Sequence, residues 1–338
     1  MLSRDLGGIQ QSFLDYSNML TILGIDNISV TSRKAKINSK VSGKHIKLPN
    51  LLSFDIISKY LLRKAIIKER PDFIICHGKR ATKFALSARK KLEHQPIIVC
   101  VAHNYVTSHL KKSDYVISIT EDLKTHLVAM GIEKNKIFVL PNTLNHENYK
   151  IIPKIHSDEF RVGTISRFVK KKGIDVFIKA IKILKNQNIT PKVYIGGSGE
   201  EEKNLKKLSK DLGLDDLITF TGWVDSKEEF FANIDLFCLP SLHEPFGIII
   251  LESMQFNTPI ISTKTEGPLE ILTDMEDSLL VESNNPEQIA EKIKICIENR
   301  NIMNKISENA LIKLKNEYYI SEVSKKFAHI IQCIKNDI

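Results

Sequence analysis

The chain has 338 residues, 42% of them hydrophobic and 26% charged, which fits a soluble globular protein of two domains. No apolar run reaches the roughly 18 residues that span a bilayer, so we expect no transmembrane helix. The first residues lack the basic start and apolar stretch of a secretory signal, so we expect no signal peptide. The net charge of +9 is concentrated in residues 1–150, which hold 24 Lys and Arg against 12 Asp and Glu.

The first half of the chain alternates short apolar runs with helical periodicity, which is typical of α/β domains built on parallel sheets. We predict buried strands at residues 73–76, 97–101, 115–119 and 137–140. A short helix over residues 123–130 ends at Gly131, a residue type favoured where helices stop. The segment from Asn142 to Ser157 is polar and contains Pro153, so we place the domain boundary at 152–153.

The alternation of strands and helices restarts in the second half. Strands are expected at residues 161–165, 192–195, 218–220, 236–239, 260–262 and 279–281, and helices over 175–185, 200–212 and 286–298. Two doubly wound, Rossmann-like domains follow from this pattern, residues 1–152 and 153–318, with ligands expected in a cleft between them. A last helix within residues 319–338 is expected to pack back on the first domain.

The most informative segment runs from Pro240 to Met254 and carries Glu244 and Glu252 with seven residues between them. A predicted strand ends just before it and a helix begins near Phe246, so Glu244 lies in the loop and Glu252 about two turns inside the helix. The free N–H groups and the dipole at that helix start form an anion site suited to a diphosphate, and Gly247 lets a ligand approach the backbone. Each glutamate taken alone also fits a capping residue or a surface residue.

A second group of residues, from Ser166 to Gly173, follows the strand at 161–165 and therefore lies at the sheet edge where ligands bind. The guanidinium of Arg167 and the ammonium of Lys172 can clamp two phosphates and stabilise charge on a departing nucleoside diphosphate. Alone, the segment also fits a solvated basic loop. The glycine-rich turn at 196–199 lacks the third glycine of a dinucleotide fingerprint, so it predicts only a tight turn between strand and helix.

Taken in order, these segments resemble the C-terminal domain of the family-4 glycosyltransferases. The matching segments are Arg167 with Lys172-Gly173, Gly196–Glu200, Phe220–Val224, Glu244–Glu252 and Gly267–Ile271. Weaker matches precede them at Gly7-Gly8, Pro71-Asp72, His77, His103, Thr120-Glu121 and Pro141-Asn142. The resemblance implies an α/β protein of the GT-B fold, with two Rossmann-like doubly wound domains facing a cleft, and a retaining glycosyltransferase.

The resemblance also implies a role for each matching residue. Arg167 and Lys172 would contact the donor diphosphate, Glu252 the ribose and Glu244 the transferred sugar. The first domain would contribute His103, which approaches the sugar, and Gly8, from a glycine loop near donor and acceptor. The expected catalytic residues are therefore His103, Glu244, Arg167 and Lys172, and the expected nucleotide-sugar contacts are Gly8, Arg167, Lys172, Val224 beside the base, the backbone of Phe246, Gly247 and Ile248, and Glu252.

One departure from the family concerns the first strand. The family opens with an apolar strand before its glycine loop, whereas here only Met1 to Leu6 precede Gly7-Gly8. That strand is central in a doubly wound sheet, so its loss is expected to leave a groove of unpaired backbone. Either the protein starts upstream of Met1 or its first domain is damaged.

By resemblance, the reaction would move a hexosyl or N-acetylhexosaminyl group from a nucleotide-sugar to a glycan or lipid-linked acceptor in lipopolysaccharide or cell-envelope polysaccharide synthesis. It would need no metal ion or other cofactor, because Arg167, Lys172 and the helix start can offset the diphosphate charge. The alternatives are a sugar-nucleotide epimerase of the same fold, a non-catalytic sugar-nucleotide binder and a nucleic-acid-binding protein. Nucleic acid is not expected as a partner, since the basic segments lack interleaved aromatic residues.

The cysteines and the charge predict where in the cell the protein is located. The five cysteines are scattered and lie mostly within apolar strings, so we expect buried thiols in a reducing cytoplasm. The basic first half favours an anionic partner and fits an enzyme bound peripherally at the inner face of the cell membrane. Alternatively, the basic charge reflects an AT-rich genome, which favours lysine at surface positions, and not an anionic partner.

Overall fold

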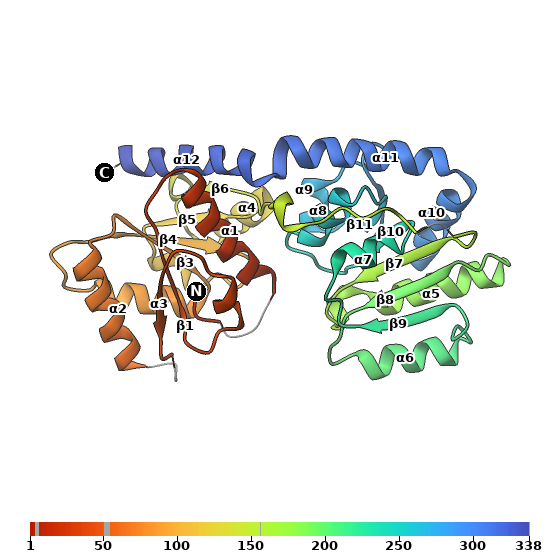
Figure 1. The fold of residues 1–338 in the computed structure, drawn as a ribbon, viewed down its shortest axis with the longest axis horizontal. Coiled ribbons are helices and arrows are strands. Elements are labelled where there is room, and N and C mark those ends of the chain that lie inside the picture. The colour runs from red at the N-terminus through yellow and green to blue at the C-terminus, as the bar shows by residue number, and fades with distance from the viewer. Residues whose placement is uncertain (4–6, 51–54, 156, 338) are drawn as a thin grey trace. The chain divides into compact units, whose positions relative to one another are not determined.

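The computed structural model describes residues 1–3, 7–50, 55–155 and 157–337, and the chain divides into two compact units (Figure 1). The first unit is Met1–Thr143 together with Ile320–Ile338, and the second unit is Leu144–Tyr319. Residues 4–6 of the segment expected before the glycine loop, and residue 156 of the expected linker, lie outside the described residues.

The first unit contains six strands and five α-helices within its described residues. They are α1 (Gly8–Ile22), β1 (Ile28–Ser32), β2 (Lys44–Leu48), α2 (Ile56–Glu69), β3 (Phe73–His77), α3 (Lys79–Arg89), β4 (Ile97–Ala102), β5 (Tyr115–Ser118), α4 (Glu121–Ala129), β6 (Ile137–Val139) and α12 (Ile320–Asn336). Strands β3 to β6 lie where the sequence predicts strands, whereas β1 and β2 have no counterpart among the predicted elements.

The strands of the first unit form two separate parallel sheets. Strands β3, β4, β5 and β6 pair in that order, and β1 pairs with β2. Within the described residues no ladder joins β1 to β3, so the interruption that the sequence predicts is present. The last helix, α12, lies along α1 (Figure 1). Phe327 of α12 packs its ring edge-on against Tyr16 of α1, with ring centroids 5.1 Å apart.

The second unit contains six strands and seven α-helices within its described residues. They are β7 (Arg161–Ile165), α5 (Ile174–Asn186), β8 (Lys192–Gly196), α6 (Glu202–Asp211), β9 (Ile218–Gly222), α7 (Lys227–Ala232), β10 (Leu236–Leu239), α8 (Ile248–Gln255), β11 (Ile260–Thr263), α9 (Glu266–Ile271), β12 (Leu279–Val281), α10 (Pro286–Glu298) and α11 (Arg300–Lys313). All six strands lie where the sequence predicts them.

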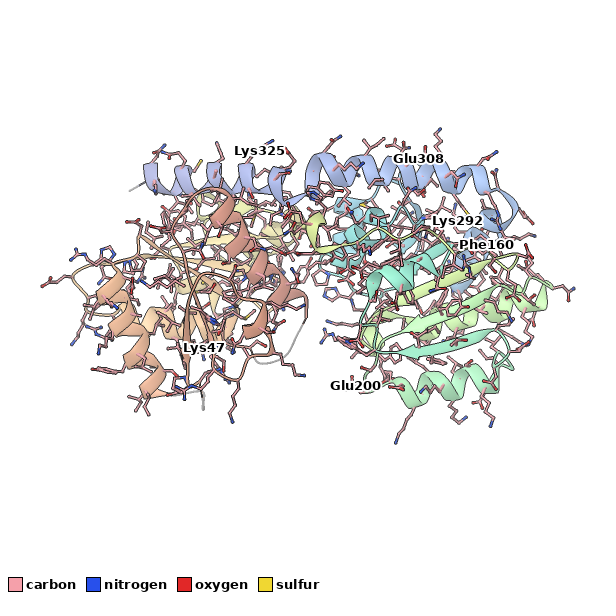
Figure 2. All side chains as sticks on the ribbon, viewed as in Figure 1. Lys47, Phe160, Glu200, Lys292, Glu308 and Lys325 are labelled. Atoms are coloured by element: carbon pink, nitrogen blue, oxygen red, sulfur yellow. The ribbon has the colours of Figure 1, made fainter. Side chains whose placement is uncertain are left out.

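One continuous parallel sheet runs through the second unit in the order β12-β11-β10-β7-β8-β9. The chain moves outward from β7 through β8 to β9, then returns to the centre and moves the other way from β10. The carboxyl ends of β7 and β10 therefore meet at the point where the strand order reverses, and ligands of open α/β sheets bind at such a point. Apolar side chains from α5 and α10 cover the sheet, and Phe160 is buried among them. Charged side chains such as Glu308 extend outward (Figure 2).

The segment expected to link the domains is part of the second unit. Leu144 forms a β-bridge with Tyr319, and its N–H donates to the carbonyl of Tyr318 at 2.9 Å. The ammonium of Lys154 donates to the carbonyls of Phe231 and Ile234, at 2.8 and 2.9 Å, and to the hydroxyl of Thr258 at 2.6 Å. Because these contacts fix the segment, the structure divides at Thr143, upstream of the boundary that its polar composition predicts.

Two further expectations concern cysteines and membrane spans. All five cysteines are free thiols, and Cys76, Cys100, Cys238 and Cys296 are buried, as their apolar surroundings in the sequence predict. Over the described part of the chain, none of the helices combines the length and the apolar character needed to cross a membrane.

Candidate functional site

The loops that follow β7 and β10 are hydrogen-bonded to each other at the centre of the second sheet. The backbone N–H of Leu242 donates to the carbonyl of Lys171 at 2.8 Å, and the N–H of His243 shares that acceptor at 3.3 Å. Arg167, Lys171 and Lys172 belong to the loop after β7, and Glu244 belongs to the loop after β10. The two sequence motifs, far apart along the chain, therefore lie side by side.

A cluster of cations faces one buried carboxylate in these loops. The ammonium of Lys172 forms an ion pair with Glu244, whose residue is only 8% exposed. Partial burial and the neighbouring charges of Lys172 and Arg167 lower the pKa of Lys171, while Glu244 opposes that shift. Arg167 is exposed at the carboxyl end of β7. The three cations near Glu244 favour the binding of a phosphate group.

The start of helix α8 adds backbone N–H groups to the same site. Gly247 precedes the helix with φ 90°, a backbone conformation that L side chains rarely adopt. A Cβ at this position would lie 3.0 Å from Ile250 Cδ1 and 3.2 Å from Glu244 Cγ, so a side chain would press on both. The backbone N–H groups of Phe246, Gly247 and Ile248, at and just before the start of α8, have no intrahelical acceptor and favour an anion. Glycine is therefore required both by the turn and by the packing.

Glu252 lies one turn further into α8 and is held by two side chains. The hydroxyl of Tyr149 donates to its Oε1 at 3.1 Å, and the ammonium of Lys227 lies 3.1 Å from its Oε2. Tyr149 comes from the segment expected to be a linker, and Lys227 is the first residue of α7. Sequence reasoning identified neither contact, because both residues lie far from Glu252 along the chain and outside the matching segments.

A third acidic residue, Glu266, also lies at the site and was missed. It opens α9, where its Oε1 lies 2.8 Å from His243 Nδ1 and its Oε2 accepts from the N–H of Glu244 at 3.3 Å. Burial alone would raise the pKa of Glu266, but the hydrogen bonds from backbone N–H groups and from His243 outweigh it and lower the pKa. Its position directly after strand β11 and next to Gly267 was the available signal.

The neighbouring glycine-rich turn packs against the segment that follows β9. Phe168 donates its N–H to the carbonyl of Ser198 at 2.8 Å, which fixes the loop of Arg167 on the turn at 196–199. Val224 is half-buried and lies against Gly196, where a Cβ would meet its Cγ2 at 2.6 Å. Trp223, beside it, is 62% exposed. An exposed aromatic ring next to the turn could stack on a flat ligand group.

The other predicted site residues, Gly8 and His103, belong to the first unit. Gly8 is the first residue of α1. His103 follows β4, and its Nε2 lies 3.0 Å from Nδ1 of His77, the last residue of β3. Burial lowers the pKa of His103 to about 4, and burial together with the charges of His103 and the Met1 amino group lowers the pKa of His77. Both rings are therefore neutral near pH 7.

The structure thus gathers Arg167, Lys172, Glu244, the start of α8 and Glu252 in the second unit. Within the described residues, no three His, Cys, Asp or Glu side chains cluster so as to hold a metal ion. The arrangement can bind a dianionic group at the cations and at the helix start, and it can accept hydrogen bonds from hydroxyl groups through its carboxylates.

Two family models match the chain, "Glycosyl transferases group 1" over residues 145–312 and "Glycosyltransferase Family 4" over residues 6–148. Among curated proteins, the lipopolysaccharide core biosynthesis glycosyltransferase LpsE of Rhizobium meliloti (strain 1021) is 25% identical over 339 residues, covering 96% of each chain.

Solved structures show the same fold over the whole chain. A glycosyltransferase from Rickettsia africae superposes with a TM-score of 0.85 and 21% identity, covering 99% of this chain and 98% of that one. Alr3699/HepE of Anabaena, solved in complex with UDP and glucose, superposes with a TM-score of 0.82 and 18% identity, covering 98% of each chain. The GT-B fold expected from the sequence is confirmed.

Proposed function

Because the chain belongs to the group 1 and family 4 glycosyltransferases, we propose that it transfers a sugar from a nucleotide-sugar to a glycan or lipid-linked acceptor with retention of configuration. The transferred group is a hexosyl or N-acetylhexosaminyl unit. The acceptor belongs to lipopolysaccharide or another cell-envelope polysaccharide, a class supported by the name of the relative LpsE. The complex of HepE with UDP and glucose supports a nucleotide-sugar donor and makes uridine the first base to test.

The observation that carries this proposal is the cation cluster beside the start of α8, at the point where the strand order reverses. Arg167 and Lys172 bind the donor diphosphate, with Lys171 adding to the local positive charge. The backbone of Phe246, Gly247 and Ile248 donates hydrogen bonds to phosphate or sugar. A leaving nucleoside diphosphate gains negative charge as its bond to the sugar breaks, so preorganised cations stabilise the transition state.

The carboxylates of Glu244 and Glu252 and the segment Trp223-Val224 would position the two ends of the donor. Glu252, held by Tyr149 and Lys227, accepts hydrogen bonds from the ribose hydroxyls. Glu244, paired with the ammonium of Lys172, accepts from a hydroxyl of the transferred sugar. Val224 borders the base.

From the first unit, His103 and Gly8 are proposed to act toward the sugar. The His103 ring, whose pKa is lowered to about 4 by burial, is neutral at pH 7 and can donate or accept one hydrogen bond there. Gly8 belongs to the proposed glycine loop near donor and acceptor.

In the proposed step, the acceptor hydroxyl oxygen forms a bond to the anomeric carbon while the bond from that carbon to the β-phosphate oxygen breaks. Attack and departure occur on the same face of the sugar, so the configuration is retained. The nucleoside diphosphate leaves with the electron pair of the broken bond. The hydroxyl proton passes to the departing phosphate oxygen, and Arg167 and Lys172 offset the charge that develops before it arrives.

The experiment that tests the donor site is calorimetric titration of the protein with UDP, GDP and ADP. We expect one of the three to bind, and Glu252→Ala to weaken that binding by about tenfold or more through the lost ribose hydrogen bonds. Glu291→Ala, on the exposed face of α10, is the matched control and should bind like the wild type. Equal binding by Glu252→Ala and wild type would contradict the assigned role. Binding without sugar transfer to any acceptor would favour a sugar-nucleotide binder.

We also propose that helix α2 of the first unit meets an anionic membrane surface, where a lipid-linked acceptor would be found. Three residues of α2, Ser58, Leu62 and Ile66, are buried and hold the helix on the unit. The opposite face exposes large apolar side chains among basic ones, namely Ile56 (78% exposed), Ile57, Tyr60 and Ile67 with Lys64 and Lys68. Exposed apolar side chains favour contact with a partner or a membrane, and the basic side chains beside them are attracted to anionic head groups.

Sedimentation with lipid vesicles tests this surface. We expect binding to vesicles that contain acidic lipid at low salt and release at high salt, because each Lys or Arg near the surface contributes about 1 kcal/mol. The double variant Ile57→Ser with Tyr60→Ser should lose most of the binding, whereas Ile312→Ser, equally exposed on α11, should keep it. Binding that is unchanged in the double variant would remove α2 from the proposal.

A further inference from the structure

The backbone of Glu244 is held by two consecutive residues at the start of α9, Glu266 and Gly267. Glu244 lies between the end of β10 and the start of α8, outside both elements, so neither a strand ladder nor a helix fixes its conformation. Its N–H donates to Oε2 of Glu266 at 3.3 Å, and its carbonyl accepts from the N–H of Gly267 at 2.8 Å. Both polar groups of the Glu244 backbone are therefore bound by the same short segment.

The start of α9 also packs directly against the backbone of the Glu244 loop. A Cβ at Gly267 would lie 2.3 Å from the Cα of Phe246 and 2.4 Å from its carbonyl oxygen, distances that real Cβ atoms do not show. A Cβ at Gly247 would lie 3.2 Å from Glu244 Cγ, so the stem of this side chain lies close to the Gly247 backbone. Because packing this close leaves no slack, a shift of α9 would move Glu244.

Glu266 uses both of its carboxylate oxygens to hold this loop. Its Oε2 accepts from the N–H of Glu244, and its Oε1 lies 2.8 Å from Nδ1 of His243, the preceding residue. Burial opposes ionisation of Glu266, but the hydrogen bonds from backbone N–H groups and from His243 outweigh it and lower the pKa. The carboxylate is therefore charged near pH 7, and hydrogen bonds to a charged acceptor are stronger than those to a neutral one.

From these contacts we propose that Glu266 is a positioning residue for sugar transfer, acting through Glu244, and that it restricts which donor sugars are used. The inference rests on the proposed function, in which Glu244 accepts from a hydroxyl of the transferred sugar. Lys172 binds the carboxylate of Glu244 from the loop after β7, while Glu266 fixes the backbone of Glu244 from the start of α9. A carboxylate held from both sides accepts best from a hydroxyl at one position and orientation on the sugar ring.

Removal of Glu266 should therefore affect the sugar more than the nucleotide. In Glu266→Ala the N–H of Glu244 loses its acceptor and His243 loses its carboxylate, while the bond from Gly267 remains. A displacement of about 1 Å at a positioned group can lower a rate by about 10²-fold. The nucleoside diphosphate is assigned to other groups, Arg167 and Glu252 among them, so its affinity should change little.

The first experiment compares nucleotide binding with donor turnover. The probes are UDP, GDP and ADP for calorimetry, and then the glucose, galactose and N-acetylglucosamine conjugates of the base that binds, with release of nucleoside diphosphate to water as the readout. We expect Glu266→Ala to lower kcat by about 10–10²-fold, with a Kd for the nucleoside diphosphate within about threefold of wild type. Glu266→Gln, whose amide oxygen can still accept one hydrogen bond, should recover part of the loss.

The control for this experiment is Glu282→Ala. Glu282 follows β12 as Glu266 follows β11, and its Oε1 lies 2.7 Å from the ammonium of Lys264. Both kcat and Kd should stay at their wild-type values. A wild type that binds no nucleoside diphosphate, or releases none from these donors, would overturn the proposed function and with it this inference. Normal nucleotide binding with wild-type kcat in Glu266→Ala would overturn the inference alone.

Two further readouts separate positioning from a general structural role. In a Glu244→Ala background, Glu266→Ala should lower kcat by less than about threefold, because the group through which it acts is gone. An equal loss in both backgrounds would overturn the proposal. The ratio of kcat/KM between the preferred conjugate and the other two should fall by about tenfold in Glu266→Ala. An unchanged ratio would overturn the assignment of sugar selectivity to Glu266.

Discussion

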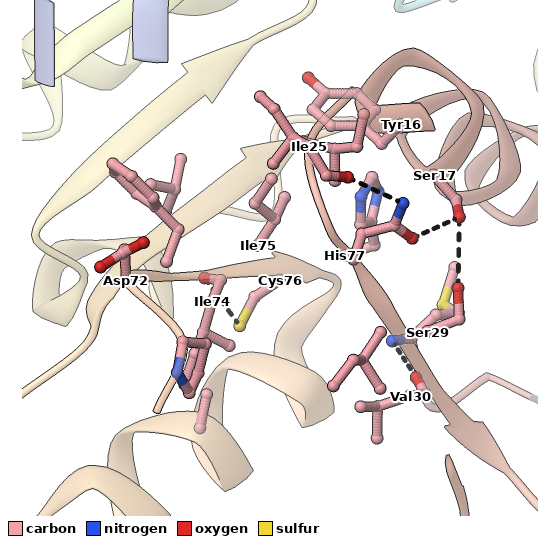
Figure 3. Close-up of a pocket in the computed structure, with 18 of the residues that line it drawn as sticks. Tyr16, Ser17, Ile25, Ser29, Val30, Asp72, Ile74, Ile75, Cys76 and His77 are labelled. Carbon is pink, nitrogen blue, oxygen red and sulfur yellow. Dashed lines mark hydrogen bonds between the residues drawn. The ribbon is translucent and has the colours of Figure 1, made fainter. Parts of the chain in front are cut away.

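The two units share one architecture but differ in how completely their sheets are joined. In the second unit, six parallel strands form one sheet, and every loop of the candidate site is hydrogen-bonded to another. In the first unit, six strands are divided between two sheets, with a cavity of about 980 Å³ between them (Figure 3). The comparison shows that the candidate site lies where one sheet is continuous, whereas the edges of β1 and β3 in the first unit are not joined within the described residues.

The largest expected effect is a loss of catalysis from changing one residue of the second unit. Arg167→Ala removes an exposed cation without disturbing the core, so we expect kcat/KM for sugar transfer to fall by about 10²–10³-fold with an unchanged unfolding midpoint. The measurement is a steady-state assay with the donor found by calorimetry. Lys179→Ala, which breaks only a surface pair with Asp175, is the control and should keep full activity. Full activity in Arg167→Ala would remove the diphosphate role.

Lys154→Ala tests whether the segment before β7 belongs to the second unit. Three buried acceptors lose their donor, so we expect the free energy of unfolding of the second unit to fall by about 1–3 kcal/mol. Urea titration followed by Trp223 fluorescence reports on this unit. Lys150→Ala, at an exposed position of the same segment, should leave the stability unchanged. A similar midpoint for both variants would show that the segment is a linker.

Gly247→Ala tests the backbone at the start of α8. We expect a loss of about 1–3 kcal/mol of stability from the positive φ and the crowding against Ile250 and Glu244, together with weaker nucleotide binding. Gly213→Ala is the matched control, because that residue has φ 65° and open space around it. It should lose stability through its backbone alone and bind nucleotide normally. Normal binding by Gly247→Ala would place the anion elsewhere.

The smallest expected effect is on the pH dependence of the stability of the first unit. The pKa of His103 is lowered to about 4 and that of His77 is also lowered, so the unfolded chain binds more protons between about pH 4 and 6.5. These residues therefore add stability above pH 6.5 that is lost as the pH falls toward 4. Burial raises the pKa of Asp15 to about 7, so this carboxyl changes the stability with pH in the opposite direction. The contribution of the two histidines must therefore be measured as the difference in stability between the wild type and a variant that lacks them.

Urea titrations of the wild type and of His77→Gln with His103→Gln, between pH 4.5 and 7.5, give that difference. We expect the stability advantage of the wild type to shrink steadily as the pH is lowered. A constant difference across this range would mean that the histidine pair is not held neutral by the fold.

The sequence predicts most of the sheet strands and misses the elements without a clear periodicity. Compact apolar runs such as Ile97–Ala102 identify a buried parallel strand, because both of its faces are covered. Strand β2, Lys44–Leu48, carries two lysines and one histidine, and only its pairing with β1 makes it a strand. Helix α2 alternates apolar and basic residues without one apolar face, so periodicity alone does not identify it.

In the candidate site, too, some residues could be predicted from the sequence and others could not. The positions of Arg167, Lys172 and Glu244 could be predicted because each lies in a loop after a predicted strand. That of Glu252 could be predicted because it lies inside the helix expected to begin near Phe246. Their partners could not, because Tyr149, Lys227 and Glu266 are brought in by packing between elements that are distant along the chain. The proximity of Lys172 to Glu244 likewise follows from the strand order, with β7 beside β10, and not from either motif.

The pairing of Leu144 with Tyr319 also has a consequence for biosynthesis. The second unit is one continuous stretch whose two ends are hydrogen-bonded to each other, so it can fold as soon as that stretch has left the ribosome. The first unit is discontinuous, and α12, which packs on α1, is made after the whole second unit. Although domains usually fold in order from the N-terminus, the N-terminal unit here is completed only after the second unit. Until then it exposes apolar surface, and we expect chaperones to bind there on the nascent chain.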